Sequence, residues 1–346
     1  MNIAIEIGTY GIKAAIQSNG KVEMVKLGDS LSPYIIPSLA YVAKTGQIVF
    51  GCLAELCDIN YGERIYLSEI MPSDNKSENI YKVLFAFLKD RIVSLYGQFV
   101  SSVTMIVPPF YKNVDPRKNV MQEAWRYNGI YNLDFISSDV STCYRKLNLN
   151  NNESALVFDI GYNGTAISVV RRDKNVFRSI ANKYINGIGG RVFCNLIYSD
   201  MEEQSKLRYD SSAQLFQVQN VDSVSRIIME DLSSNETVVT NVPFTDYIYS
   251  ISREKFNEMI NKPLEESLNE CLACIKDSGV SMDNIKKIVL TGGCSKIPYI
   301  EKILRLFFNT GNTEKKDVIA PKSVEDALFA ACKGAFTVQQ TSILKF

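Results

Sequence analysis

Residues 3–16 read IAIEIGTYGIKAAI, and residues 157–169 read VFDIGYNGTAISV. The two segments match each other, and the aligned residues include Glu6 with Asp159, Gly8 with Gly161, and Gly11 with Gly164. In each copy a carboxylate ends an apolar strand, and a turn that carries glycine leads into a second apolar strand. The repeat therefore predicts two β-hairpins in two related halves of the chain.

The turn of each hairpin has the residue types that suit a nucleotide phosphate. Glycine lets backbone N–H groups approach a phosphate without a Cβ atom in the way. Glu6 and Asp159 directly precede the turns, where they could hold a hydrated Mg²⁺ ion through its water molecules. Thr9 and Thr165 could add hydroxyl donors. The simpler interpretation is that the glycines only make turns, but the duplication favours a phosphate site.

A third glycine segment lies near the end of the chain, where residues 288–298 read IVLTGGCSKIP. Gly292 and Gly293 separate an apolar strand from a predicted helix. This order of strand, glycine pair and helix allows a nucleotide to lie flat against the backbone. A Gly-Gly turn is common, so the segment gains weight only together with the two hairpins.

The composition is that of an ordinary globular protein with room for two domains. The chain has 346 residues, of which 46% are hydrophobic, and its 38 basic residues balance its 38 acidic ones. A formal charge of zero gives no general attraction to nucleic acid or to an anionic membrane. No apolar run approaches the ~18 residues of a membrane helix, and Met1 leads directly into a strand, which leaves no room for a signal peptide. We therefore expect a cytoplasmic protein.

Histidine is absent from the chain, and eight cysteines are scattered along it. The absence of histidine excludes Ser-His and Cys-His nucleophiles, imidazole bases and most zinc sites. Cys271 and Cys274 form a CxxC motif inside an amphipathic helical pattern, so we expect them to be core thiols. The chemistry is left to carboxylates, lysine, backbone amides and an oxygen-bound metal ion.

Strands and helices alternate twice along the chain, which predicts α/β lobes with mixed sheets. The restart follows the loop-like run NLNNNE at residues 148–153. We expect a first lobe over residues 1–152 and a second over residues 153–323. Residues 207–252 lean toward β-structure, and a small subdomain is expected at about 200–252. A closing helix at 324–337 should pack back on the first lobe, before a short tail at 338–346.

Further segments lie in the same order as those of a known family. They read GQIVFGCLA at 46–54, IVPPFY at 106–111, ISSDVSTCY at 136–144, GIGGRVFCN at 187–195 and VEDALFAACKGAF at 324–336. With the two hairpins, these segments resemble the nucleotide-binding domain of the seventy-kilodalton heat-shock chaperones (Hsp70, DnaK type), within the actin-like ATPase superfamily. The resemblance implies two related ribonuclease H-like lobes around a central nucleotide cleft.

The resemblance also implies ATP or ADP with Mg²⁺ as cofactors. The residues implied to contact the nucleotide are Gly8, Thr9, Gly161, Gly164, Gly189, Gly190, Gly292, Gly293 and Lys296. Glu6, Asp139 and Asp159 would hold Mg²⁺ through water molecules. These three carboxylates and Thr165, which would lie near the attacking water, form the implied catalytic set.

The sequence departs from the family pattern at several of these places. Glu6 stands where the family has aspartate, and Asp139 where it has glutamate. Arg226 and Met229 fall where a glutamate and a lysine would hold the ribose. The family's catalytic lysine has no clear equivalent, and Arg64 is only a guess at it.

Two functions remain open from the sequence. The first is a stand-alone domain that binds ATP–Mg²⁺ and signals its nucleotide state to a protein partner by lobe closure, with weak or no hydrolysis. The second is a pseudo-ATPase that serves as an interaction scaffold. A filament-forming actin relative is less favoured, and a sugar or acetate kinase is less favoured still. Because the chain ends about ten residues after the closing helix, we expect no peptide-binding domain; we also expect no nucleic-acid or membrane partner.

Overall fold

The computed structural model describes residues 1–29, 32–70, 75–111, 115–206, 214–243, 245–310 and 315–343. The chain forms two compact units. The first unit comprises Met1–Asn152, Val170–Ser179 and Leu328–Phe346, and the second comprises Glu153–Val169 and Ile180–Ala327. Parts of the expected subdomain at 200–252 and of the expected tail at 338–346 lie outside the described residues.

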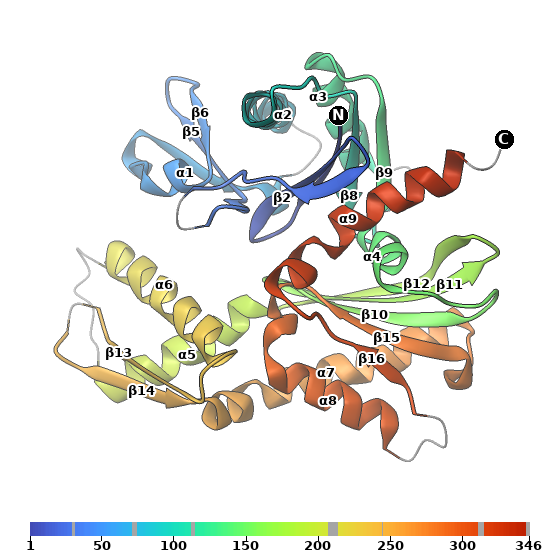
Figure 1. The fold of residues 1–346 in the computed structure, drawn as a ribbon. Coiled ribbons are helices and arrows are strands. Elements are labelled where there is room, and N and C mark those ends of the chain that lie inside the picture. The colour runs from blue at the N-terminus through green and yellow to red at the C-terminus, as the bar shows by residue number, and fades with distance from the viewer. Residues whose placement is uncertain are drawn as a thin grey trace. The chain divides into compact units, whose positions relative to one another are not determined.

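A six-stranded mixed sheet forms the centre of the first unit, with the order β3-β2-β1-β8-β9 and with β4 beside β2 (Figure 1). Its strands are β1 (Asn2–Ile7), β2 (Gly11–Ser18), β3 (Lys21–Met24), β4 (Ile36–Pro37), β8 (Ser102–Val107) and β9 (Leu133–Ser137). β1 and β2 are antiparallel, whereas β1, β8 and β9 are parallel. The carboxyl ends of β1, β8 and β9 therefore share one edge of the sheet, the place where open α/β sheets bind ligands.

Helices of the first unit pack their apolar faces on this sheet. They are α2 (Asn75–Tyr96), α3 (Pro116–Tyr127) and α4 (Ser138–Lys146). Trp125 stacks on Phe85 at 4.3 Å between ring centroids, and its indole N–H donates to the sulfur of Met105. The Asp115 side chain caps α3 by accepting from the Arg117 N–H, and Pro116 lies in the first turn, a pair of residues typical of a helix N-terminus.

A small three-stranded sheet also belongs to the first unit. It has the order β6-β5-β7, with β5 (Leu39–Ala43), β6 (Ile48–Phe50) and β7 (Gly62–Tyr66). The short helix α1 (Cys52–Leu56) and the 3₁₀ turns η1 (Ile59–Tyr61) and η2 (Leu67–Glu69) adjoin it. Leu39, Tyr41 and Ala54 form its small core.

The second unit is built on a five-stranded sheet with the order β12-β11-β10-β15-β16 (Figure 1). Its strands are β10 (Ser154–Ile160), β11 (Gly164–Asp173), β12 (Val176–Asn186), β15 (Ile285–Thr291) and β16 (Asp317–Ile319). Apart from β4, the order matches that of the first sheet strand for strand, and β10, β15 and β16 are parallel like β1, β8 and β9. The internal repeat predicted from the two hairpins is therefore present at the level of topology.

Helices and a two-stranded sheet complete the second unit. The helices are α5 (Gly190–Ser205), α6 (Gln214–Leu232), α7 (Arg253–Ser278) and α8 (Pro298–Asn309), with the 3₁₀ turns η3 (Met282–Asn284) and η4 (Gly293–Lys296); the strands are β13 (Thr237–Asn241) and β14 (Ile248–Ser252). The β-leaning interpretation of residues 207–252 is wrong for 214–232, which form α6. Cys271 and Cys274 of α7 are buried free thiols in the core, as expected.

The last helix, α9 (Val324–Ile343), joins the first unit from Leu328 onward. Its Phe329, Cys332 and Phe336 form a buried cluster with Ala4 of β1 and Ala15 of β2. Gly334 lies against the backbone of α4, where an added Cβ atom would come within 1.8 Å of the Ser141 carbonyl oxygen. None of the helices in the described ranges is both long and apolar enough to cross a membrane.

Candidate functional site

The first hairpin joins β1 to β2, and its register pairs Glu6 with Lys13 across the two strands. The turn closes through a hydrogen bond from the Gly8 N–H to the Gly11 carbonyl at 3.1 Å. A Cβ atom at Gly8 would lie 3.2 Å from that same oxygen, which is tighter than an ordinary contact. A side chain at position 8 would therefore push the two backbone segments apart by a few tenths of an ångström.

The second hairpin, between β10 and β11, repeats this geometry. The Gly161 N–H donates to the Gly164 carbonyl at 3.0 Å, and a Cβ atom at Gly161 would lie 3.3 Å from the same oxygen. Gly164 itself is packed against β12, since a Cβ atom there would lie 2.4 Å from the Ile185 carbonyl oxygen. The sequence repeat thus has its counterpart in one backbone hydrogen bond that recurs in both halves.

The turn of the second hairpin is held by the segment that begins α5. The N–H groups of Gly190 and Arg191 donate to the carbonyls of Gly161 and Tyr162 at 3.0 and 2.8 Å. A Cβ atom at Gly189 would lie 2.6 Å from the Gly161 carbonyl oxygen. The first glycine pair, Gly189–Gly190, therefore supports the hairpin by direct backbone contact.

The other glycine pair lies against Asp159. Gly292 has a φ of 90°, and a Cβ atom there would come within 2.4 Å of the Asp159 Oδ1 and of the Ile160 carbonyl oxygen. Gly293 begins η4, whose Cys294 thiol donates to the Gly161 carbonyl at 3.4 Å. In the second unit, Asp159, the hairpin turn and both glycine pairs are thus gathered in one place.

Three further predicted residues of the second unit lie around this group. The Thr165 hydroxyl is fully buried and donates to the Ile188 carbonyl at 2.7 Å, so its proton is engaged inside the fold. Lys296 is half-buried at the end of η4. Met229 is buried, and its Cε would lie 3.7 Å from a Cβ atom at Gly190.

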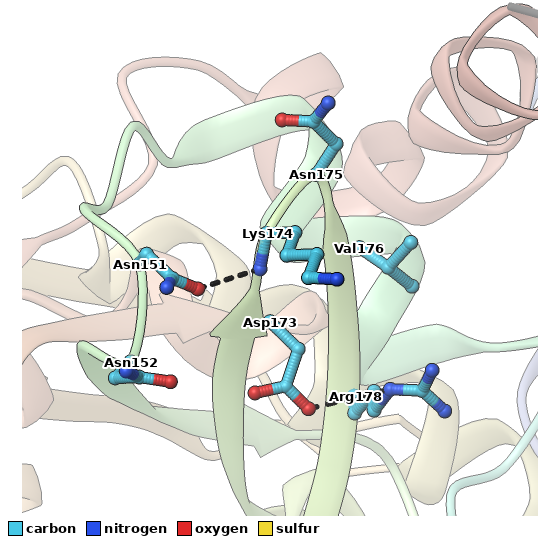
Figure 2. Close-up of a pocket in the computed structure, with 7 residues that line it drawn as sticks. All are labelled: Asn151, Asn152, Asp173, Lys174, Asn175, Val176 and Arg178. Carbon is cyan, nitrogen blue, oxygen red and sulfur yellow. Dashed lines mark hydrogen bonds and ion pairs between the residues drawn. The ribbon is translucent and has the colours of Figure 1, made fainter. Parts of the chain in front are cut away.

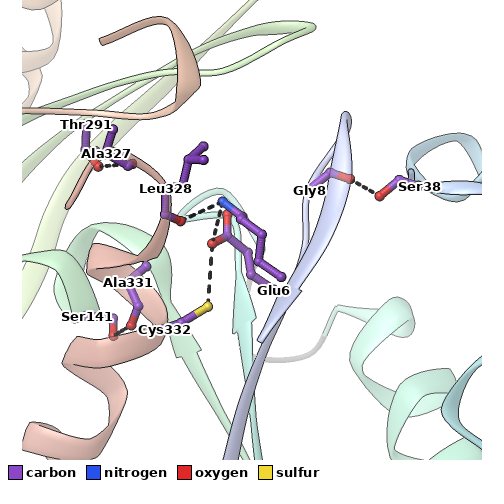
Figure 3. Close-up of polar contacts among 10 residues, drawn as sticks. Glu6, Gly8, Ser38, Ser141, Thr291, Ala327, Leu328, Ala331 and Cys332 are labelled. Carbon is purple, nitrogen blue, oxygen red and sulfur yellow. Dashed lines mark hydrogen bonds and ion pairs between the residues drawn. The ribbon is translucent and has the colours of Figure 1, made fainter. Parts of the chain in front are cut away.

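In the first unit, Glu6 and Lys13 form an ion pair (Figure 3). The Lys13 Nζ lies 3.1 Å from the Glu6 Oε2, and their side chains are only 13% and 19% exposed. The same ammonium donates to the Leu328 carbonyl of α9 at 3.0 Å, and the Cys332 Sγ lies 4.0 Å from the Glu6 Oε2. Burial raises the pKa of the Cys332 thiol, and the Glu6 charge adds to that shift. Glu6 is therefore a charge-compensated carboxylate in a largely shielded position.

Asp139 lies in the first turn of α4, directly after β9, and is 3% exposed. Its Oδ1 accepts from the Val140 N–H at 2.8 Å. Its Oδ2 is buried and has no hydrogen-bond partner among the side chains and backbone groups that the structure describes. A buried carboxylate oxygen of this kind fits a contact with a metal-bound water molecule, because an unpartnered buried acceptor is otherwise unfavourable.

Gly8 and Thr9 complete the predicted set in the first unit. The Gly8 carbonyl accepts from the Ser38 hydroxyl, and Thr9 is half-buried at the turn. Within the described ranges, no group of three or more histidine, cysteine, aspartate and glutamate side chains lies close enough to hold a metal ion directly.

Two residues of interest are absent from the sequence-based set. Lys13 could have been found by counting, since a turn that pairs Gly8 with Gly11 must pair Glu6 with Lys13. Tyr184 of β12 lies against the second hairpin, with its hydroxyl 2.7 Å from a Cβ atom built at Gly164. Burial raises the pKa of Tyr184, and the Asp159 charge adds to the shift. No sequence signal distinguishes Tyr184 from the other tyrosines.

A separate pocket of about 480 Å³ lies in the first unit, at the far end of the β11–β12 hairpin (Figure 2). Asn151, Asn152 and residues 173–176 line it together with Arg178. The Asn151 side chain accepts from the Lys174 N–H at 2.6 Å, and Asp173 lies 3.3 Å from the Arg178 guanidinium. These residues are not among the predicted site residues, and the pocket adds nothing to the candidate site.

Cys294 gives a first prediction, because burial raises its pKa from 9.0 to about 12. The thiolate is the nucleophile, so at pH 8 the reactive fraction should be smaller than that of an ordinary thiol by a factor on the order of 10³. We expect iodoacetamide to leave Cys294 unmodified in the folded protein and to modify it in urea. Peptide mass spectrometry measures both. Modification of Cys294 as fast as that of half-buried Cys57 in the folded protein would contradict the burial.

Comparisons with known proteins agree on one family. The family model described as "Hsp70 protein" matches residues 64–338, well over half of the chain. The matched range contains Asp139, the second hairpin and both glycine pairs, whereas the first hairpin lies before it.

Several curated proteins named "Chaperone protein HscA homolog" are similar to this chain. That of Haemophilus influenzae strain PittEE is 26% identical over 214 residues, which cover 61% of this chain and 33% of the relative. That of Mannheimia succiniciproducens is 26% identical over 242 residues, covering 70% and 37%. That of Actinobacillus pleuropneumoniae serotype 5b is 24% identical over 233 residues, covering 67% and 36%. The chain thus spans about a third of the length of these relatives.

Proposed function

The chain belongs to the Hsp70 protein family and has its α/β, actin-like ATPase fold, and from this premise we propose that it binds ATP or ADP with Mg²⁺ at the second glycine hairpin. We further propose that it passes its nucleotide state to a protein partner, with weak or no hydrolysis. Family membership supports nucleotide binding, generally with Mg²⁺. The partner, the rate of hydrolysis and a cytoplasmic location are our proposals.

One observation carries the binding proposal: Asp159 and two glycine pairs are packed around the turn at 161–164. The Gly161 carbonyl oxygen accepts two hydrogen bonds, one from the Gly190 N–H and one from the Cys294 thiol. These hydrogen bonds fix the turn from behind, and a fixed turn holds its N–H groups in position without reorganisation when an anion binds. Gly161, Gly164, Gly189 and Gly292 allow the segments around the turn to pack this closely, because a Cβ atom at each would meet a backbone oxygen or the Asp159 carboxylate.

The proposed roles of the remaining residues follow their positions. In the first unit, Gly8 and Thr9 would contact phosphate at the first turn. In the second, Gly190, Gly293 and Lys296 would pack on the nucleoside. Asp139 and Asp159 would hold Mg²⁺ through its water molecules, and the ion would supply charge neutralisation of the phosphates.

Two observations favour weak or absent hydrolysis. The Thr165 hydroxyl already donates its proton to the Ile188 carbonyl, so that proton is not available to orient a water molecule. Glu6, a second member of the implied catalytic set, is paired with Lys13. Phosphoryl transfer depends on correctly positioned polar and charged groups, so the Thr165 hydrogen bond and the Glu6–Lys13 ion pair would both slow it. A pseudo-ATPase interaction scaffold is therefore the second candidate function.

The second prediction tests nucleotide binding by calorimetric titration with ADP and Mg²⁺. We expect wild-type protein to bind, and Asp159→Ala to weaken ADP binding at least tenfold, about 1.4 kcal/mol. Asp173→Ala is the matched control, because Asp173 lies on the adjoining strand away from the turn. The affinity of this variant for ADP should stay within about twofold of wild type. If about 1 mM ADP gives no binding heat with wild-type protein, nucleotide binding fails. Phosphate release from ATP that is lost in Asp159→Ala would exclude the pseudo-ATPase.

A further inference from the structure

We propose that Lys13 is a fixed cation that neutralises Glu6 in place of a metal ion, so that Glu6 is not a Mg²⁺ site. The inference has two tests, of which the second, with ADP, rests on the proposed nucleotide binding and the first, with Mg²⁺ alone, does not. It departs from the expectation that Glu6, Asp139 and Asp159 share the metal. The three carboxylates are not equivalent in the structure, and the difference lies in what each one faces.

The ion pair is built into the strand register. β1 and β2 pair Glu6 directly with Lys13, and directly opposed residues of antiparallel strands project to the same face of the sheet. Ile12 and Ala14, the neighbours of Lys13 along β2, are fully buried on the other face. The lysine therefore cannot leave the face that Glu6 occupies without breaking the hairpin.

A second contact holds the ammonium in place. Its Nζ donates to the Leu328 carbonyl at 3.0 Å while lying 3.1 Å from the Glu6 Oε2 (Figure 3). Leu328 belongs to α9, whose Cys332 and Phe336 are buried against the same sheet. The charge is thus anchored between a strand and a packed helix, and its position does not depend on a flexible loop.

The second hairpin lacks this lysine. The same count that pairs Glu6 with Lys13 through the first turn places Ala166 opposite Asp159 through the second turn. The two hairpins share the same turn hydrogen bond and the same glycines. They differ in the residue opposite the carboxylate. By this count, the position opposite the carboxylate is an alanine in the second hairpin and a lysine in the first.

The pairing changes the preference of Glu6 for a metal ion. A Mg²⁺ ion at Glu6 would have to approach an ammonium that is itself shielded from water, and like charges in such a place repel strongly. Moving Lys13 away would leave its charge buried without a partner. Asp139 differs from Glu6, because its buried Oδ2 has no partner among the described residues. Metal binding is therefore not expected at Glu6.

The first test uses the metal alone. Three proteins are compared: wild type, the double variant Glu6→Gln/Lys13→Met, which removes both charges at similar side-chain length, and the single variant Lys13→Met. Thermal unfolding is measured in EDTA and in about 10 mM Mg²⁺. We expect the Mg²⁺-induced rise in Tm to be equal for wild type and double variant, and larger for Lys13→Met. A rise in wild type that the double variant loses would place Mg²⁺ on Glu6 and overturn the proposal.

The second test uses ADP. The quantity compared is the ratio of the Kd in EDTA to the Kd in Mg²⁺. We expect this ratio to agree within about threefold between wild type and double variant, and to rise at least tenfold in Lys13→Met, where the unpaired Glu6 repels phosphate unless a cation is present. Lys21→Met, at an exposed position of β3, is the control and should match wild type.

The outcomes of the two tests separate the two claims. If the ratio of the Kd for ADP in EDTA to the Kd in Mg²⁺ were tenfold lower in the double variant than in wild type, the role of Lys13 would be overturned and nucleotide binding would stand. If none of the proteins binds ADP, nucleotide binding fails, and the metal-only comparison still decides whether Glu6 binds Mg²⁺. Because the double variant carries no unpaired charge, the decision does not depend on whether Lys13→Met folds.

Discussion

Gly189→Ala is expected to weaken ADP binding by a factor of about 10² or more, although it adds only one methyl group. That methyl carbon would lie 2.6 Å from the Gly161 carbonyl oxygen, 2.7 Å from the Tyr162 carbonyl oxygen and 3.0 Å from the Gly164 nitrogen. All three are backbone atoms of the second hairpin, so no side chain can move aside. The turn must shift, and a displacement of about 1 Å in a positioned site can change its function about a hundredfold. Calorimetric titration with ADP measures the loss.

Gly187→Ala is the matched control for this variant. Gly187 has a φ of 82°, so alanine is strained there, but no atom lies within 4 Å of its Cβ position. It should lose about 1 kcal/mol of unfolding free energy and bind ADP within about threefold of wild type. Equal losses of ADP affinity in Gly187→Ala and Gly189→Ala would show that strain in the loop matters and that the contact with the turn does not.

Gly334→Ala is expected to cause the largest loss of stability. Its methyl carbon would lie 1.8 Å from the Ser141 carbonyl oxygen and 2.7 Å from the Ser141 carbonyl carbon, where α9 crosses α4. The Ser141 hydroxyl also donates to the Ala331 carbonyl at 2.6 Å, which ties the helices at this point. Separating them would disturb the cluster around Phe329 and Phe336. We expect a loss on the order of 4 kcal/mol, measured by urea unfolding.

Gly46→Ala provides the reference for this stability effect. Gly46 has a φ of 87° and no atom within 4 Å of its Cβ position. Gly46→Ala should lose about 1 kcal/mol of unfolding free energy, from backbone strain alone. If Gly334→Ala unfolds at the same urea concentration as wild type, α9 does not pack on α4 as closely as described.

The parts of the fold that were predictable are those that local patterns determine. The hairpin repeat follows from apolar strands and glycine turns within about a dozen residues, and the start of α3 follows from Asp115 and Pro116. The matching order of the two sheets follows in turn from the repeat, because the same sequence of strands and crossovers leads to the same topology.

Longer-range packing explains the errors. Residues 214–232 form α6 although their sequence leans toward strand, and Ile228, Met229 and Leu232 of this helix are buried in the core of the second unit. Their burial stabilises a helix that intrinsic preference does not favour, since tertiary context overrides weak propensities. No local sequence pattern predicts that packing.

The arrangement of the candidate residues could be predicted only in part. Asp159 and Gly292 lie at the carboxyl ends of the parallel strands β10 and β15, which share one edge of the sheet, so their proximity could be predicted. The partner of Thr165 could not, because the Ile188 carbonyl lies 23 residues away and becomes an acceptor only through the fold. Whether a hydroxyl is engaged inside the protein or available to a ligand is decided by such contacts.

The most direct test of nucleotide binding at the second hairpin is a crystal structure of the protein grown with ADP and Mg²⁺. We expect phosphate oxygens within hydrogen-bond distance of the backbone N–H groups of residues 162–164, since the Gly161 N–H closes the turn, with Mg²⁺-bound water molecules on Asp159 and Asp139. We expect no metal-bound water on Glu6, which should remain paired with Lys13. Nucleotide bound elsewhere, or an empty turn in crystals grown with millimolar ADP, would contradict nucleotide binding at this hairpin.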